Sequence, residues 1–309
     1  MWFNNVLVYS YQSKQMFSQI QAMEQEHLKP CPPHARFTFG WIPPFEQELI
    51  HEVAGCIMVC LGKEERILPR SVIQRHLTEK IKALETERGF AVKRSERAHL
   101  AEDIEFELLP KAFCLQKKLY ALFDTVEQRL ILNTSSVNQA SQLLALLRKS
   151  IPDIQIDPVG SPDNLALRFN DWINHPNDLP PNFSLASDCI LSSLDNEKKR
   201  FACKGGELNE IQSLLAQGFS ATEVSLIWDE RIQFTLTQAL SLKRIKCLDY
   251  LQDELHQIAD MDGEELQRDA RITLLAGELR GLCNSITAEL VAQSAQPKNS
   301  AHAAVACDA

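Results

Sequence analysis

A charged, helix-forming segment between two apolar strands is the feature of this chain that most constrains its fold. The apolar run 56–61, closed by Gly62, is typical of a buried strand, and a second strand is expected over 119–124. Between them, apolar side chains recur at helical spacing over 69–88 and again over 95–109, with Lys, Arg and Glu at the other positions. Two helices joined by a short connection are therefore predicted, and such an inserted hairpin projects from the protein body.

Outside this insertion, the pattern predicts an α+β chain in two modules. A stretch rich in Pro, Asn and Asp over 151–182 is typical of a module boundary. Before it, Ser136 is expected to cap a strongly amphipathic helix. Beyond it, we expect a strand near 183–191, a helix over 207–217, strands across 222–238, and helices after 243 and 264.

The predicted fold class is thus α+β, with mixed sheets packed against helices. Its expected parts are a centre α+β domain (1–62 and 119–160), an inserted helical hairpin (63–118), a second α+β module (161–292) and a disordered tail (293–309).

Charge is unevenly distributed along the chain. The whole sequence carries 32 Lys and Arg against 41 Asp and Glu, a formal net charge of −9. Residues 63–118, which we call the finger, hold 13 basic and 10 acidic residues, so the finger carries +3 and the rest of the chain −12. Because phosphates attract local positive charge, an acidic total does not exclude binding of nucleic acid.

Two further basic clusters occur in the second half of the chain. A basic cluster is ordinarily a solvated face, but three clusters on an acidic chain favour binding of DNA phosphates without sequence readout. The candidate DNA contacts are Arg75, Arg88, Lys93, Arg94, Arg97, Lys111, Lys117 and Lys118 in the finger, and Lys198, Lys199, Arg200, Arg231, Lys243 and Arg244 beyond it. A protein-interaction scaffold, with the finger binding a partner protein, is an alternative.

Catalytic motifs are incomplete in this sequence. His51-Glu52 begins an HExxH zinc motif, but Gly55 stands where the second histidine is needed. Pro162-Asp163 followed by Glu197-Lys198-Lys199 matches the loose PD…ExK pattern of metal-dependent nucleases, in which carboxylates hold magnesium. A metal-dependent nuclease is therefore the enzymatic alternative, although Pro162-Asp163 is also typical of a turn. We predict no enzyme activity, no cofactor and no metal site.

The cysteines indicate the compartment. There are nine, an odd number, without a CxxC motif and mostly in apolar surroundings, which favours reduced thiols in a cytosolic protein. No run approaches the roughly 18 apolar residues that a membrane-spanning helix needs. We therefore expect a cytoplasmic protein without a membrane partner.

Several stretches, in order along the chain, resemble the recombination-associated protein RdgC family of proteobacteria. They span residues 1 to about 290 and weaken between 151 and 220. The matching stretches are Met1–Tyr9, Gly40–Pro44, Lys63–Pro69, Leu108–Phe113, Asp124-Thr125, Leu144–Ser150, Arg231–Phe234, Ser241–Arg244 and Gly277–Leu279.

The resemblance implies a nucleoid-associated, non-enzymatic protein that binds double-stranded DNA. It implies a horseshoe-shaped protomer with a tip, a centre and a base, and a ring-shaped homodimer that encircles DNA and restrains the RecA recombinase. The finger corresponds to the tip, so Phe113 becomes a candidate dimer contact and Lys111 a candidate phosphate contact. An alternative role for Phe113 is to anchor the hairpin core. Phe90-Ala91 stand where the family pattern has basic residues, which leaves Lys93 and Arg94 as the remainder of that patch.

Overall fold

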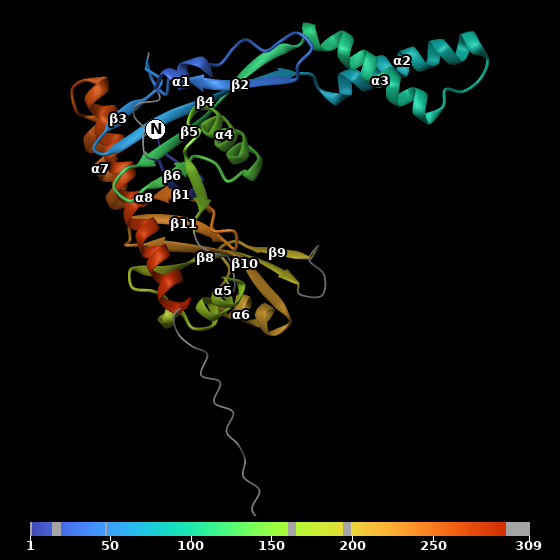
Figure 1. Ribbon diagram of the computed structural model, residues 1–309. Coiled ribbons are helices and arrows are strands. Elements are labelled where there is room, and N and C mark those ends of the chain that lie inside the picture. The colour runs from blue at the N-terminus through green and yellow to red at the C-terminus, as the bar shows by residue number, and fades with distance from the viewer. Residues whose placement is uncertain (1, 14–19, 47, 160–164, 194–198, 295–309) are drawn as a thin grey trace, which may run out of the picture.

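Two antiparallel sheets and a projecting helical hairpin make up the protein (Figure 1). The computed structural model describes residues 2–13, 20–46, 48–159, 165–193 and 199–294. The first sheet has the strand order β2-β4-β5-β6-β1-β7, with β3 also paired to β4. Its strands are β1 (Leu7–Gln12), β2 (Phe37–Ile42), β3 (His51–Val53), β4 (Cys56–Ile67), β5 (Phe113–Asp124), β6 (Arg129–Leu132) and β7 (Gln155–Pro158).

The second sheet has the strand order β12-β11-β10-β8-β9. Its strands are β8 (Phe183–Ser193), β9 (Arg200–Cys203), β10 (Phe219–Trp228), β11 (Ile232–Thr237) and β12 (Leu242–Cys247). The two sheets meet where the Val6 N–H donates to the Leu242 carbonyl at 2.7 Å and the Leu242 N–H donates back at 3.0 Å. The segment before β1 therefore joins the sheets.

Helices cover the sheets and form the finger. In chain order they are α1 (Ile20–Gln25), α2 (Arg70–Arg88), α3 (Arg94–Leu108), the 3-10 turn η2 (Leu109–Lys111), α4 (Val137–Ser150), α5 (Leu165–Asn174), the 3-10 turn η3 (Pro176–Asp178), α6 (Leu208–Ala216), α7 (Asp249–Ala259) and α8 (Glu264–Ser294). Ser136 caps α4 as predicted, because its hydroxyl accepts the Gln139 N–H at 3.5 Å. None of the helices within the described ranges is long and apolar enough to cross a membrane.

Inside the body, the first sheet is buried on both faces, whereas the ends of β4 and β5 that enter the finger are partly or fully exposed. One face packs under α4, where Trp41, Val59 and Leu147 share a cluster. The other face joins the larger core, in which Met58 and Leu122 lie with Phe234 of the second sheet and apolar residues of α8. Because α8 runs along both sheets, one core holds them together.

The protomer has a horseshoe-like outline. The finger projects to the right of the body in Figure 1, and β9 with the end of β8 projects on the same side, below it. The α+β class is confirmed. The expected mixed sheets are instead antiparallel in every ladder between the described strands.

Two strands run further into the finger than predicted. β4 and β5 pair without interruption from Cys56↔Asp124 to Ile67↔Phe113. Gly62 does not close β4. A side chain there would place its Cβ atom 2.8 Å from the Ile42 side chain, so this glycine allows close packing inside a continuing strand.

Strands β2, β3 and β7 were not predicted, and further differences lie in the second half of the chain. α5 forms within the stretch expected to be a boundary, and the helix expected after residue 243 begins only at Asp249. The residues before it form β12, which contains Arg244 at a positive φ of 54° and a register shift. This bulge obscures the alternation that would have predicted a strand.

Candidate nucleic-acid interface

The finger is an antiparallel helix pair carried on the β4–β5 ribbon. Gly89 ends α2 with a φ of 74°, and its N–H donates to the Glu85 carbonyl at 3.0 Å. The Glu85 carboxylate then accepts the Val92 N–H at 2.9 Å, and Val92 is buried. These bonds fix the connection between the helices at the free end of the finger.

Two of the candidate DNA contacts at this end, Arg88 and Arg97, bind other residues of the finger. The Arg88 guanidinium donates to Glu96 at 2.5 Å. The Arg97 guanidinium donates to the Val92 carbonyl at 3.2 Å and lies 3.6 Å from the Glu85 carboxylate. Arg88 and Arg97 therefore connect the two helices, and only part of their N–H donors remain available to a ligand.

Lys93 and Arg94 are the available cations at this end. Lys93 precedes α3 and Arg94 is its first residue, and both are exposed. Among the described residues, neither has a carboxylate within 4.0 Å. The helix dipole disfavours a cation at a helix N-terminus, so Lys93 and Arg94 do not stabilise α3.

The cations nearer the body differ in their surroundings. Arg75 on α2 and Lys111 are exposed, and neither has an ion-pair partner in the described part of the chain. Lys117 pairs with Glu65, whose pKa is lowered by hydrogen bonds from Lys117 and then Lys63. Lys118 points to the other side of the ribbon from Lys117, since successive strand residues alternate.

The β8–β9 projection carries the second predicted cluster. Lys199 and Arg200 are exposed, and no carboxylate among the described residues lies within 4.0 Å of either. Lys198 lies outside the described residues. Arg200 begins β9, the edge strand, opposite Ser192.

The charge of the third predicted basic cluster, Lys243 and Arg244, is largely neutralised. The Lys243 ammonium lies 2.9 Å from Glu223, and the Arg244 guanidinium lies 3.4 Å from the other oxygen of the same carboxylate. Arg244 remains half exposed and also donates to the Thr235 hydroxyl at 3.3 Å. One carboxylate shared by two cations leaves about one net positive charge beside the junction of the sheets.

Arg231 does not fit a DNA contact. Its side chain is 19% exposed and donates to Glu278 of α8 at 2.6 Å and to Glu254 of α7 at 3.0 Å. These two carboxylates raise its pKa, with Glu278 the larger cause. Since α7 and α8 lie on the side of the body away from the finger (Figure 1), Arg231 belongs to an internal ion-pair network.

Phe113 lies on an exposed apolar patch. It is 85% exposed at the start of β5, opposite Ile67, which is 47% exposed. Leu115 and Phe37 follow on the same face, each 43% exposed. The alternative in which Phe113 anchors the hairpin core is therefore wrong.

Arg66 is an important residue of the finger that sequence reasoning missed. Its guanidinium donates to the carbonyls of Cys31 and Pro32 at 3.1 and 3.2 Å, and to those of Leu109 and Ala112, both at 3.2 Å. It also reaches the carbonyl of residue 110 at 3.3 Å. Arg66 thus holds the base of the finger against the loop before β2. The sequence did not predict this role, because the bonds go to backbone carbonyls, which every residue carries.

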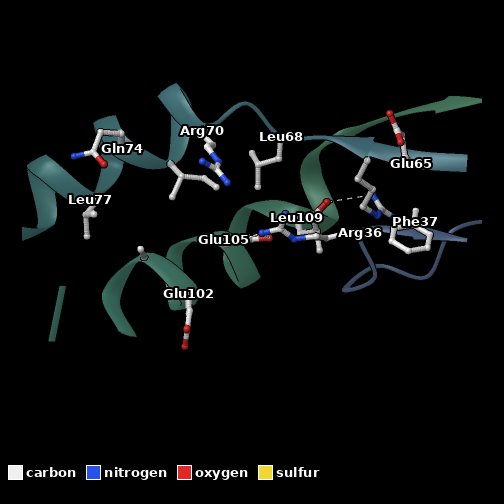
Figure 2. A pocket seen from close by; sticks show the side chains of 13 residues that line it. Arg36, Phe37, Glu65, Leu68, Arg70, Gln74, Leu77, Glu102, Glu105 and Leu109 are labelled. Atoms are coloured by element: carbon white, nitrogen blue, oxygen red, sulfur yellow. Dashed lines mark hydrogen bonds and ion pairs between the residues drawn. The ribbon is translucent and has the colours of Figure 1, made fainter. Parts of the chain in front are cut away.

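A cavity of about 510 Å³ lies at the base of the finger, between its helices and strands β2 and β4. Figure 2 shows Arg36 beside Glu105, at 2.5 Å, with Arg70 facing the cavity from the first turn of α2. The lining combines three arginines with three glutamates over an apolar floor. Its charges balance, so the cavity does not extend the basic surface.

Most residues of the PD…ExK pattern, on which the nuclease alternative rests, are not among the described residues. Asp163, Glu197 and Lys198 lie outside the described residues. Within the described ranges, no three His, Cys, Asp or Glu side chains gather as a metal site would require. His51, from the incomplete zinc motif, instead contacts Asp269 of α8 at 2.8 Å.

Comparison with known proteins identifies the family. The family model described as "Putative exonuclease, RdgC" matches residues 1–293. Proteins named "Recombination-associated protein RdgC" are similar along nearly their whole length. The one from Pseudoalteromonas translucida is 32% identical over 93% of this chain and 97% of its own length. The one from Aeromonas hydrophila is 32% identical over 94% and 98%, and the one from Proteus mirabilis 31% over 93% and 97%. The chain therefore belongs to the RdgC family.

Proposed function

We propose that this protein binds double-stranded DNA through its phosphates, with little sequence preference, as a nucleoid-associated protein of DNA recombination. The name of its relatives, which calls them recombination-associated, supports the role in recombination. The binding mode follows from the charges, because the described elements offer exposed cations and no pattern that reads bases.

The observation that carries the proposal is the position of the exposed cations that have no ion-pair partner among the described residues. Lys93 and Arg94 lie at the end of the finger, and Lys199 and Arg200 lie on the β8–β9 projection. Both projections leave the body on the same side (Figure 1). A rod of negative charge placed between the projections meets cations from both, while the net negative charge of the rest of the chain disfavours contact elsewhere.

A second copy of the chain would complete the enclosure. The patch of Phe113, Ile67, Leu115 and Phe37 exposes apolar surface on the finger strands and the adjoining end of β2, which a homodimer contact would bury. Two horseshoes joined at their projections make a ring, and a ring around DNA occupies the substrate on which RecA filaments grow. The proposal thus includes a DNA-encircling dimer that restrains RecA.

The test compares two arginines that differ in location. Arg94→Gln removes a charge from the finger, and Arg271→Gln removes one from α8, on the other side of the body. Neither arginine has an ion-pair partner within the part of the chain that the structure describes. For duplexes of unrelated sequence, we expect Arg94→Gln to reduce the slope of log affinity against log salt by about 0.9 per protomer, since one phosphate contact is lost. Arg271→Gln should leave this slope unchanged. Equal effects of the two variants would refute the assignment.

The link to RecA needs its own assay. DNA strand exchange by RecA should slow when the duplex is first incubated with this protein. The double variant Lys93→Gln/Arg94→Gln should restore the exchange in proportion to its lost DNA affinity. Full inhibition by a variant that no longer binds DNA would instead indicate direct contact with RecA, and the DNA-occupancy mechanism would be wrong.

Exonuclease activity is the second candidate, and the description of the matching family model favours it. If this candidate holds, linear DNA with magnesium or manganese should be degraded from its ends, and Asp163→Ala should abolish the degradation. No cleavage above that of Asp163→Ala removes this candidate. Absence of duplex binding at low salt would instead favour the protein-interaction scaffold.

A further inference from the structure

Cys189 and Cys203 form a directly opposed thiol pair across two strands. Cys189 on β8 and Cys203 on β9 are partners in the antiparallel register, so their side chains lie on the same face of the sheet. Both are free thiols. Among cysteines on the described strands, this is the one pair in which two thiols stand opposite each other.

Their separation suits a disulfide. The Ser193 N–H donates to the Lys199 carbonyl at 3.0 Å, which marks the pair 193/199 as hydrogen-bonded. Hydrogen-bonded pairs recur at every second position, so Cys189/Cys203 is of the same kind, with Cα atoms roughly 5.5 Å apart. Disulfides join Cα atoms from about 4.4 to 6.8 Å apart, so the bond needs no large movement of the backbone.

The two thiols already interact and differ in exposure. Burial, followed by the neighbouring Cys203 thiol, raises the pKa of Cys189 to about 12. Cys189 is 5% exposed, whereas Cys203 on the edge strand is half-buried. Cys203 is therefore the thiol that reagents meet first, and Cys189 lies directly opposite it in the strand register.

A cavity borders Cys189, and Cys203 does not line it. It has a volume of about 430 Å³ and is lined by Cys189 and Asp188 of β8 and by Leu208 and Ile211 of α6. Next to it, the Asp188 carboxylate accepts the Gly205 N–H at 3.0 Å, which holds the turn after β9 against β8. The end of β9 is thus fixed with Cys203 facing its partner.

We propose that Cys189 and Cys203 are a redox-active dithiol that a small-molecule disulfide, such as glutathione disulfide, converts to a cross-strand disulfide. The Cys203 thiolate attacks one sulfur of the reagent, its S–S bond breaks, and one thiol leaves. The Cys189 thiolate then attacks the Cys203 sulfur and displaces the second thiol. Two protein thiols are oxidised, one disulfide is reduced to two thiols, and the two protein protons end on those thiols.

The experiment uses the folded, full-length protein in glutathione buffers of increasing oxidised fraction. Free thiols are then blocked with N-ethylmaleimide, and the protein is digested with trypsin without reduction. Trypsin separates the two cysteines, since Lys198, Lys199 and Arg200 lie between them in the sequence. We expect a linked pair of peptides containing Cys189 and Cys203, which dithiothreitol releases. Alkylation of both cysteines at every glutathione ratio, in protein that keeps its native circular dichroism, would overturn the proposal.

Single variants test the order of the steps. Cys189→Ser should stop at a mixed disulfide between glutathione and Cys203, because the second thiol is missing. Cys203→Ser should leave Cys189 unmodified, because that thiol is buried. Cys247→Ser, the matched control on β12, should still form the link. A link that forms only after guanidinium unfolding, or that Cys247→Ser abolishes, would contradict the proposal.

Discussion

The ion pair between Asp124 and Arg280 offers a demanding test of how the two sheets are held together. Asp124 ends β5 of the first sheet and is 1% exposed, while Arg280 belongs to α8, which also packs on the second sheet. The guanidinium donates to both carboxylate oxygens, at 2.7 and 2.8 Å. The same carboxylate accepts the Val126 and Glu127 N–H groups at 3.0 and 3.3 Å. Removal of Arg280 therefore leaves a buried charge with only part of its hydrogen bonding.

The size of the effect follows from these contacts. Arg280→Met removes two charge-assisted hydrogen bonds and keeps most of the side-chain volume, so we expect the free energy of unfolding to fall by about 3 kcal/mol. The two remaining N–H donors keep the loss at the low end of the range for a broken buried pair. Denaturation in urea measures it, since the midpoint falls while the slope stays constant.

A double-mutant cycle separates this reasoning from a packing effect. Asp124→Asn removes the buried charge, so adding Arg280→Met to it should cost far less than Arg280→Met alone. Strictly additive losses, or a loss below about 1 kcal/mol for Arg280→Met, would refute the view that this pair links β5 to α8.

Three further outcomes follow from the structure. In Gly40→Ala the new Cβ would lie 2.5 Å from the Leu28 backbone nitrogen, so we expect urea denaturation to give a loss above about 2 kcal/mol, and a native midpoint would be contrary evidence. Arg66→Lys loses the planar donor set, so hydrogen exchange at the amides of Leu109, Lys111 and Ala112 should accelerate about tenfold, whereas unchanged protection would show that these bonds are dispensable. Burial raises the pKa of Cys283 from 9.0 to about 12, so the folded state keeps this proton at a pH where the unfolded state loses it. Stability should therefore decline as the pH rises above 9, and less steeply in Cys283→Ala, and parallel declines in thermal unfolding would contradict this assignment.

The parts of the fold that were predictable depend on neighbours in sequence. Helical spacing located the finger helices to within a residue or two, and Ser136 marked the start of α4. The prediction that Gly62 ends its strand was wrong, because this glycine makes room for the side chain of Ile42 from another strand. Likewise β12 was hidden by a bulge that pairing with β11 produces.

The candidate site shows the same division. The excess of positive charge in the finger was visible in the sequence, and so were Lys93 and Arg94. Which cations are neutralised was not visible, because their partners come from elsewhere. Arg231 pairs with carboxylates 23 and 47 residues away, and Lys243 pairs with Glu223 of β10, which is separated from β12 by β11 in the sheet. Charge counts along a chain identify candidates, and only the fold separates free cations from paired ones.

The salt dependence of binding to two duplexes of equal length and unrelated sequence tests the central claim most directly. If the protein holds DNA by its phosphates, log affinity should fall linearly with log salt, with a slope near −0.9 for each phosphate contacted. The two sequences should give the same line to within about threefold in affinity, well short of the 10³-fold or greater preference of specific binders. Affinity that does not change with salt, or that depends strongly on sequence, would contradict the account.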